Sequence, residues 1–496
     1  MPDRGDELFD VRVHKRQELK SQGVDPYPPR ANRTHTNQQA AAFFAEAESA
    51  AKAQSAEART SDVSIAGRIM AIRNMGRSAF LKIVDGTGSL QAHLRRDLLG
   101  DRYTLLAQLD LGDHLGVRGP LFRTRTGEIT VEAREITMLS KALRPPPEKW
   151  HGLKDTEQRF RQRELDLMSS EEVRNRFLLR GRVVRSIRNF LDGRGFLEVD
   201  TPVLVPVPAG AMARPFTTHH NALDRDLYLR IATELYLKRC VIGGLDRVYE
   251  IGRVFRNEGI DLKHNPEFTT LESYEAYADY RDVMRMVEEM VSTAVREATG
   301  ATRVTFGDDA IDFATPWPRL DLRQAVLDAT GIDVDRSTDP SALAAQMRKA
   351  GIDTGARASF GLLVDKIVSE KVEPRLLQPT FLVDYPKEMS PLAKEKPEDP
   401  RYVERFEAFA GGMEIANAFT ELNDPVEQRK RFQEQEELRK LYGEEDFDRL
   451  DEAFLLAIEH GMPPTGGLGV GIDRLVMLFS GQRSIREVVL FPQLRT

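Results

Sequence analysis

The chain has 496 residues, 41% of them hydrophobic and 30% charged, a balance typical of globular proteins, and its length predicts two or three domains. No run of about 18 apolar residues occurs, so we expect no membrane span. Cys240 is the only cysteine, which excludes an internal disulfide and a cysteine-based zinc site. The charged N-terminus lacks the apolar segment of a secretory signal, and we expect a cytoplasmic protein. The net charge of −7 argues against a generally basic, nucleic-acid-binding surface.

The first 60 residues predict a helical extension. Residues 7–21 show helical spacing that ends at Gly23 and a cluster of prolines, and residues 38–58 are rich in alanine. We expect both helices to pack on the domain that follows rather than to form a separate RNA-binding arm.

Short strand-like runs separated by glycine-containing turns fill residues 61–143 and predict a small closed barrel, the OB-fold. These runs are residues 63–74, 80–85, 89–94, 114–123 and 128–139. Phe80 could stack on an unpaired base, and Gln91 and Glu128 could hydrogen-bond a base edge. A phenylalanine in a barrel is more often part of the core. Arg68 and Arg73 are weaker candidates for the same surface.

Residues 144–165 predict a stiff linker, because three consecutive prolines from Pro145 to Pro147 begin a segment rich in charges. From residue 166 onward, long amphipathic segments and strands predict a second domain, with a mostly helical insertion near residues 320–377.

The beginning of this second domain combines a helix, a strand and a loop of small residues. Residues 177–191 predict the helix and residues 196–202 the strand. In the loop at residues 208–216, Gly210 would let the backbone approach a ligand closely. Glu234 follows in a segment with helical spacing.

A predicted antiparallel hairpin, with strands at 246–255 and 267–276, concentrates charge beside aromatic residues. Alternation places Phe268, Glu272 and Tyr274 on one face of the second strand. So many charged side chains beside apolar ones are unfavourable unless they bind a charged ligand. The guanidinium group of Arg256 can donate two parallel hydrogen bonds to a phosphate, and the flat ring of Phe268 could stack under a nucleobase.

A second predicted hairpin turns at Gly411 and Gly412. Pairing outward from the turn places Glu407 and Glu414 side by side, and like charges so placed repel unless a cation lies between them. Mg²⁺ prefers oxygen ligands and substrate phosphates, so this pair predicts a magnesium site. In a regular strand Asn417 and Glu421 would lie on the opposite face, and a site that uses both sets requires a bend.

The glycine-rich segment 466–479 predicts a strand that leads into a helix. Arg474 near the helix start adds positive charge to a positive dipole end, which is useful only if an anion binds there. The segment is neither a P-loop nor a dinucleotide-binding fingerprint.

In this order, the segments resemble the class II aminoacyl-tRNA synthetases, and the bacterial-type lysyl-tRNA synthetases most closely. The helix and strand at 177–202 are similar to motif 1, the hairpin at Arg253 to Tyr274 to motif 2, and the segment 466–479 to motif 3. The barrel resembles the anticodon-binding domain of the lysyl, aspartyl and asparaginyl enzymes. The resemblance implies an α+β protein with an N-terminal OB-fold barrel and a catalytic domain built on an antiparallel sheet flanked by helices.

The resemblance also implies ATP, L-lysine, tRNA(Lys) and Mg²⁺ as ligands, and a homodimer. Arg256 and Arg474 would be catalytic. ATP would be bound by Arg256, Glu258, His264, Asn265, Phe268, Gly471 and Arg474. Lysine would be bound by Gly210, Glu234, Glu272, Tyr274, Asn417 and Glu421. Glu407 and Glu414 would hold Mg²⁺, and Phe80, Gln91 and Glu128 would contact the anticodon. The chain departs from the family at Glu164, Ala209 and Thr233, where Tyr, Gly and Pro are usual.

Three alternatives remain open. An aspartyl- or asparaginyl-tRNA synthetase would need a less acidic pocket than one with Glu234 and Glu421. A non-catalytic RNA-binding relative would be expected to lack Arg256 or Arg474, and both are present. A paralogue that transfers lysine to protein or lipid would be expected to lack the barrel or to carry membrane segments.

Overall fold

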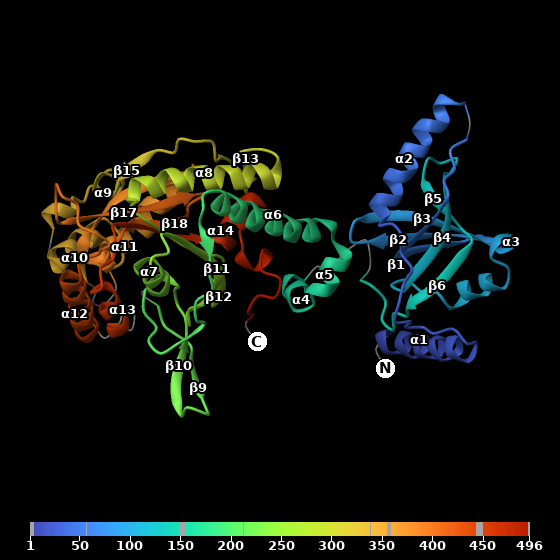
Figure 1. Cartoon of the computed structure of the whole chain (residues 1–496), viewed down its shortest axis with the longest axis horizontal. Coiled ribbons are helices and arrows are strands. Elements are labelled where there is room, and N and C mark those ends of the chain that lie inside the picture. Colours follow the sequence, from blue (N-terminus) through green and yellow to red (C-terminus); the bar gives the residue numbers. More distant parts are fainter. Residues whose placement is uncertain are drawn as a thin grey trace. The chain divides into compact units, whose positions relative to one another are not determined.

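The computed structural model describes residues 4–55, 57–147, 155–211, 213–337, 339–354, 359–442 and 450–494 (Figure 1). The chain forms two compact units, residues 1–154 and 155–496, and the division falls inside the segment 144–165. Within the described ranges, no helix has both the length and the apolar character needed to cross a membrane.

The first unit is a closed β-barrel of five strands with a sixth strand beside it. The order β1-β2-β3-β5-β4 closes because β1 also pairs with β4, and β6 pairs with the other side of β4. The strands are β1 (Asp62–Asn74), β2 (Ser78–Asp85), β3 (Gly88–Arg95), β4 (His114–Arg123), β5 (Ile129–Ala133) and β6 (Glu135–Ser140). The predicted run 128–139 is wrong as a single strand, because β5 ends at Ala133 and β6 begins at Glu135, where the chain pairs with a different part of β4.

Two helices cover this barrel, as their composition predicts. They are α1 (Arg4–Ser21) and α2 (Asn37–Ala53), and the short α3 (Arg96–Leu99) follows β3. Thr36 and Gln39 form a reciprocal capping box that fixes the start of α2. Leu19 of α1 and Phe44 of α2 are fully buried in the barrel core.

The second unit is organised on an eight-stranded sheet with the order β15-β16-β17-β18-β19-β12-β11-β7. All neighbours are antiparallel except the two edge pairs, β11–β7 and β15–β16. The strands are β7 (Leu197–Glu198), β11 (Arg247–Phe255), β12 (Glu267–Ala276), β15 (Arg319–Asp321), β16 (Thr380–Pro386), β17 (Tyr402–Ala410), β18 (Met413–Thr420) and β19 (Thr465–Gly471). The hairpin that resembles motif 2 is β11 and β12, and it lies between β19 and the edge strand β7.

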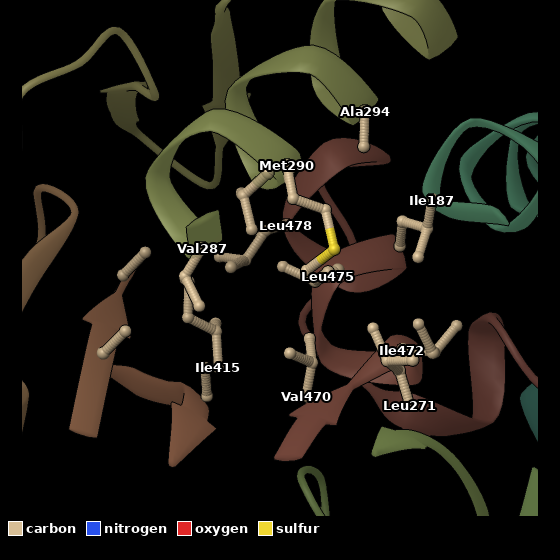
Figure 2. Close-up of a cluster of buried hydrophobic side chains, with 14 of the residues drawn as sticks. Ile187, Leu271, Val287, Met290, Ala294, Ile415, Val470, Ile472, Leu475 and Leu478 are labelled. Carbon is tan, nitrogen blue, oxygen red and sulfur yellow. The ribbon is translucent and has the colours of Figure 1, made fainter. Parts of the chain in front are cut away.

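Three helices pack on one face of this sheet and form the main core: α6 (Glu171–Gly193), α8 (Tyr280–Thr299) and α14 (Ile472–Phe479). Figure 2 shows Val287, Met290 and Ala294 of α8 above the sheet residues Ile415 and Val470. Because side chains alternate along a strand, the residues next to these core positions project from the opposite face. That opposite face carries the candidate site.

The remaining elements surround the sheet. The predicted helical insertion contains α9 (Leu322–Thr330), α10 (Pro340–Lys349) and α11 (Phe360–Ile367), which share a second core with residues of β16 and β17. The other helices are α4 (Thr156–Arg161), α5 (Arg163–Ser169), α7 (Glu234–Ile242), α12 (Pro425–Tyr442) and α13 (Glu452–Ile458). The small strands are β8 (Leu204–Val205), β9 (Thr217–His220), β10 (Arg225–Leu229), β13 (Arg303–Phe306) and β14 (Asp309–Asp312).

The segment after residue 155 is helical and anchored to the second unit. Arg163 is fully buried, pairs with Asp166 at 2.7 Å and donates to the carbonyls of Arg486 and Leu490 at 2.8 and 2.9 Å. These bonds tie α5 to the C-terminal segment of the chain. Glu164, the departure from the family pattern, is exposed on the same helix.

Candidate active site

A bulge in β18 brings two sets of polar side chains onto one face of the sheet. The β17–β18 register pairs Phe409 with Glu414, as predicted, but it pairs Ala408 with Ala416, so Ile415 is an extra residue. Ile415 and Ala416 are both buried in the main core. Glu414 and Asn417 therefore project from the opposite face together, and this bulge is the bend that a site using both sets requires.

Two arginines define one end of the site. Arg256 follows β11, and its guanidinium carbon lies 5.2 Å from the ring centroid of Phe268. Burial lowers the pKa of Arg256, although Glu258, Glu414 and Glu272 oppose that change. The Arg256 Nε atom is buried without a hydrogen-bond partner. A buried donor left unpaired is unfavourable, which indicates that an anionic ligand completes this end.

The second arginine is held in place by two residues of the predicted site. Arg474 Nη1 donates to the carbonyl and the Oε2 atom of Glu414, at 2.8 and 2.9 Å. Its Nη2 lies 3.4 Å from Nε2 of His264, whose Nδ1 is 2.8 Å from Asp261 Oδ2. This arrangement suits a His264 tautomer that donates to Asp261 and accepts from Arg474. Gly471, the last residue of β19, caps the helix that carries Arg474.

Asn265 and Glu258 complete the nucleotide-binding prediction, and they differ in exposure. Asn265 is buried, donates from Nδ2 to the Glu267 carbonyl at 2.6 Å, and keeps an unpaired Oδ1 acceptor. Glu258 is exposed in the hairpin loop and acts on Arg256 through its charge. Asn265 is therefore positioned to accept a hydrogen bond from a ligand.

The other end of the site is an acidic pocket. Glu234 begins α7, Glu272 and Tyr274 lie on β12, and Glu421 follows β18, and all four are 8% exposed or less. Burial, reinforced by Glu234, raises the pKa of Glu272 to about 7. Burial likewise holds the pKa of Glu421 well above its usual range, with Lys238 opposing. Carboxylates so placed require cationic partners.

Two departures from the family pattern lie beside this pocket. The backbone N–H of Thr233 donates to Glu272 Oε1 at 3.1 Å, a bond that proline at this position could not make. Gly210, next to Ala209, has a φ of +91°, and a side chain there would meet the Cβ atoms of Ala232 and Glu234 at 3.4 Å. The loop of small residues therefore lies directly against the start of α7.

The predicted metal pair adjoins the arginine end, where Arg474 bonds Glu414. Glu407 accepts from Tyr385 Oη and from Arg405 Nη2, both at 2.7 Å. Burial raises the pKa of Glu407, opposed by Arg405 and reinforced by Glu414. Burial would also raise the pKa of Glu414, but Arg474, Arg405 and Arg256 together outweigh it and lower that pKa. Within the described ranges no cluster of three His, Cys, Asp or Glu side chains has the geometry of a metal site. Two carboxylates fit Mg²⁺ only if phosphates and water supply its other ligands.

In the first unit, Phe80 lies on the outside of the barrel and not in its core. Its neighbours Ala79 and Leu81 are fully buried, whereas the Phe80 ring stacks on His93 with centroids 4.2 Å apart. Gln91 lies two residues before His93 and donates to Thr130 Oγ1 at 3.0 Å. Glu128 is exposed, just before β5.

Comparison with known proteins agrees with both units. The family described as tRNA synthetases class II (D, K and N) matches residues 155–495, and the OB-fold nucleic acid binding domain matches residues 63–139. A lysine–tRNA ligase of Dehalococcoides mccartyi is 55% identical over 485 residues, which cover 98% of this chain and 96% of that protein.

Two further relatives are similar to this chain over nearly their whole length. The lysine–tRNA ligase of Pelotomaculum thermopropionicum is 51% identical over 492 residues, covering 99% of this chain and 95% of that protein. The lysine–tRNA ligase of Chloroflexus aurantiacus is 51% identical over 488 residues, covering 98% and 97%. The chain belongs to the class II tRNA synthetases of the D, K and N group.

The synthetase site contains residues that the sequence did not single out. Lys238 is buried and contacts Glu234 and Glu421. Arg405 bonds both Glu407 and Asn417, whose Oδ1 accepts from its Nε at 3.0 Å. His93 extends the stack at Phe80. The i,i+4 spacing of Glu234 and Lys238 was the only signal for the lysine, and the spacing of two between Arg405 and Glu407 was the signal for the arginine.

Proposed function

We propose that this synthetase is a lysine–tRNA ligase, which activates L-lysine with ATP and transfers it to the 3′ end of tRNA(Lys). The observation that carries this proposal is the buried pocket of Glu234, Glu272 and Glu421, whose acidity suits a substrate with two ammonium groups. The names of the relatives that cover the whole chain support the same substrate.

In the first step the lysine carboxylate attacks the α-phosphorus of ATP. A new oxygen–phosphorus bond forms, the bond to the β-phosphate oxygen breaks, and pyrophosphate leaves. The carboxylate is already an anion at neutral pH, so no protein base is needed. We assign to Arg256 and Arg474 the stabilisation of charge on the phosphates, and to Phe268 and Asn265 the binding of the adenine. The unpaired Nε of Arg256 supports its role.

Glu407 and Glu414 would hold Mg²⁺, which when bound would neutralise charge on the ATP phosphates. The repulsion between the two carboxylates supports this assignment, because a cation between them would relieve it. Asn417 and Tyr274 would complete the lysine-binding site, and Gly210 would close it on the side of α7.

In the second step a ribose hydroxyl at the 3′ end of the tRNA attacks the lysyl carbonyl, and AMP leaves. We assign recognition of the anticodon to the outer face of the barrel, through Phe80, Gln91 and Glu128. The outward position of the Phe80 ring supports base stacking there.

We also propose that the enzyme is a homodimer that works in the cytoplasm, where its three substrates are found. Exposed apolar residues of the second unit support the dimer: Leu197 is 51% exposed and Tyr277 74% exposed. Both line a groove of about 660 Å³ together with Leu245. Light scattering on the purified protein tests this assembly, and a monomer at micromolar concentration would contradict it.

The function is tested by ATP–pyrophosphate exchange with each of the twenty amino acids in turn. We expect exchange with L-lysine alone. A response to aspartate or asparagine would favour the related synthetases, and the absence of any exchange would favour a non-catalytic RNA-binding relative. Charging of tRNA(Lys) transcripts, with a protein acceptor as a control, separates a tRNA ligase from a protein-modifying paralogue.

A further inference from the structure

A lysine of the protein itself lies inside the acidic pocket. Lys238, one turn after Glu234 on α7, has a side chain with no exposed surface, and its Nζ donates to Glu234 Oε1 at 2.5 Å. The same Nζ forms an ion pair with Glu421 Oε2. The ring centroids of the three surrounding aromatic residues lie 5.5 to 6.0 Å from it, and these residues are Tyr274, Phe419 and Phe454.

Glu421 is held toward Lys238 by the backbone of β19. A Cβ atom on Gly467 would lie 1.8 Å from Glu421 Oε1, so the carboxylate occupies space that only a glycine leaves open. Neither Glu421 oxygen has a hydrogen bond of normal geometry, and both are buried. The ammonium of Lys238 is therefore the main compensation for this carboxylate among the described residues.

Burial alone would lower the pKa of Lys238, but Glu234 and Glu421 outweigh it and raise that pKa. The charged groups that act on Lys238 are Glu234 on its own helix and Glu421 after β18, and Glu272 on β12 acts on Glu421. Three carboxylates and one ammonium leave a charge of two negatives when all are ionised. A diamino acid brings two ammonium groups, and their approach favours the charged forms of Glu272 and Glu421.

We infer that Lys238 is a positioning residue for substrate selection: it holds Glu421 and Glu234 in place before lysine binds, and its positive charge offsets part of the negative charge of the pocket. This inference rests on the proposed function. It requires that Lys238 remain in place when the substrate binds, with the aromatic rings around it acting as a fixed wall. Removing its charge would leave carboxylates that repel one another and take up protons.

The test is the KM for L-lysine in ATP–pyrophosphate exchange with Lys238→Met, which keeps the length of the side chain, and Lys238→Arg, which keeps its charge. We expect Lys238→Met to raise the KM for lysine by about tenfold or more at pH 7, equivalent to the loss of one charged contact. The KM for ATP should change less than about twofold, since the arginine end of the site is unaltered. Lys238→Arg should recover most of the affinity.

The pH profile separates this role from simple packing. In Lys238→Met the KM for lysine should fall with rising pH more steeply than in wild type, because Glu421 has lost the ammonium that favours its charged form. A packing defect would instead raise the KM by the same factor at every pH. Arg239→Met, which removes the exposed neighbouring cation on α7, is the matched control and should leave the KM unchanged. A lower KM in Lys238→Met would overturn the inference, because it would mean that Lys238 competes with the substrate.

Thermal unfolding with and without L-lysine gives a readout that needs no turnover, and Lys238→Gln serves if Lys238→Met does not fold. The stabilisation by lysine should be lost in the neutral variants and kept in Lys238→Arg; an equal stabilisation in all of them would overturn the inference. Wild-type protein that shows no lysine-dependent exchange would instead contradict the proposed function itself.

Discussion

Replacing Glu272 with glutamine should stabilise the empty enzyme at alkaline pH while weakening its affinity for lysine. Glu272 is 8% exposed on β12, and burial together with Glu234 raises its pKa from an ordinary 4.5 to about 7. The pocket therefore holds this carboxylate against its preference for the protonated state. Glutamine has the same shape and can still accept the Thr233 N–H, but it has no charge to bury.

The sign and size of this change in the free energy of unfolding follow from the linkage between protonation and folding. Between pH 4.5 and 7 the folded protein binds a proton at Glu272 that the unfolded chain has released, so the free energy of unfolding falls as pH rises. At about 1.4 kcal/mol for each pH unit, the difference between the two pKa values is worth roughly 3 kcal/mol. That contribution is fully present below pH 4.5 and lost above pH 7. The glutamine variant should gain about this amount over wild type between pH 4.5 and 8.

Urea unfolding at several pH values measures this gain. Trp317 is 2% exposed in the second unit and reports on its unfolding, provided that Trp150 is replaced by Phe in every variant. Glu267→Gln, at the half-buried start of the same strand, controls for the loss of a carboxylate outside the pocket. If the difference in free energy of unfolding between Glu272→Gln and wild type is the same at pH 5 and pH 8, burial of the Glu272 charge does not destabilise the protein as expected.

Three substitutions test other parts of the site. Arg256→Ala should lower lysine-dependent pyrophosphate exchange by roughly 100-fold or more, and Arg256→Lys should restore little because a point charge lacks the fork; unchanged exchange would refute the role of Arg256. Phe80→Ala should lower kcat/KM for tRNA charging roughly tenfold to 100-fold and leave exchange intact, whereas equal losses in both assays would make Phe80 structural. Gly467→Ala places a Cβ atom 1.8 Å from Glu421 Oε1 and should raise the KM for lysine roughly tenfold. Gly469→Ala, whose nearest neighbour would be 3.8 Å away, is its control and should have little effect.

Local sequence patterns predicted the hairpin of β11 and β12 accurately. The expected strands, 246–255 and 267–276, agree with β11 and β12 to within one residue, because alternating apolar residues end at a polar segment containing Gly259 and Pro266. The turn at Gly411 and Gly412 was also predicted correctly, and the two glycines have positive φ values of +59° and +67°. Where the backbone conformation depends on nearby residues, the sequence is sufficient.

Features set by distant partners could not be predicted in this way. The run of residues around Ile415 fits a regular strand, and the bulge arises because β19 fixes Ala416 opposite Val470 while the core buries Ile415 as well. Lys238 would ordinarily be interpreted as a solvated residue on a helix. Its burial depends on Glu421, which comes from an element far along the chain.

The acidic pocket gives a physical reason why specificity and stability oppose each other in this fold. The charged forms of Glu272 and Glu421 are unfavourable in the empty protein, since burial raises the pKa of each. An arriving ammonium group relieves that penalty, so part of the binding energy is the release of strain stored during folding. A substrate with one ammonium group could relieve only part of it. Discrimination between a diamino acid and a neutral analogue therefore depends on how well the pocket keeps its carboxylates buried and in position for an arriving ammonium group. Lys238 and Gly467 are the residues whose geometry holds Glu421 in that position.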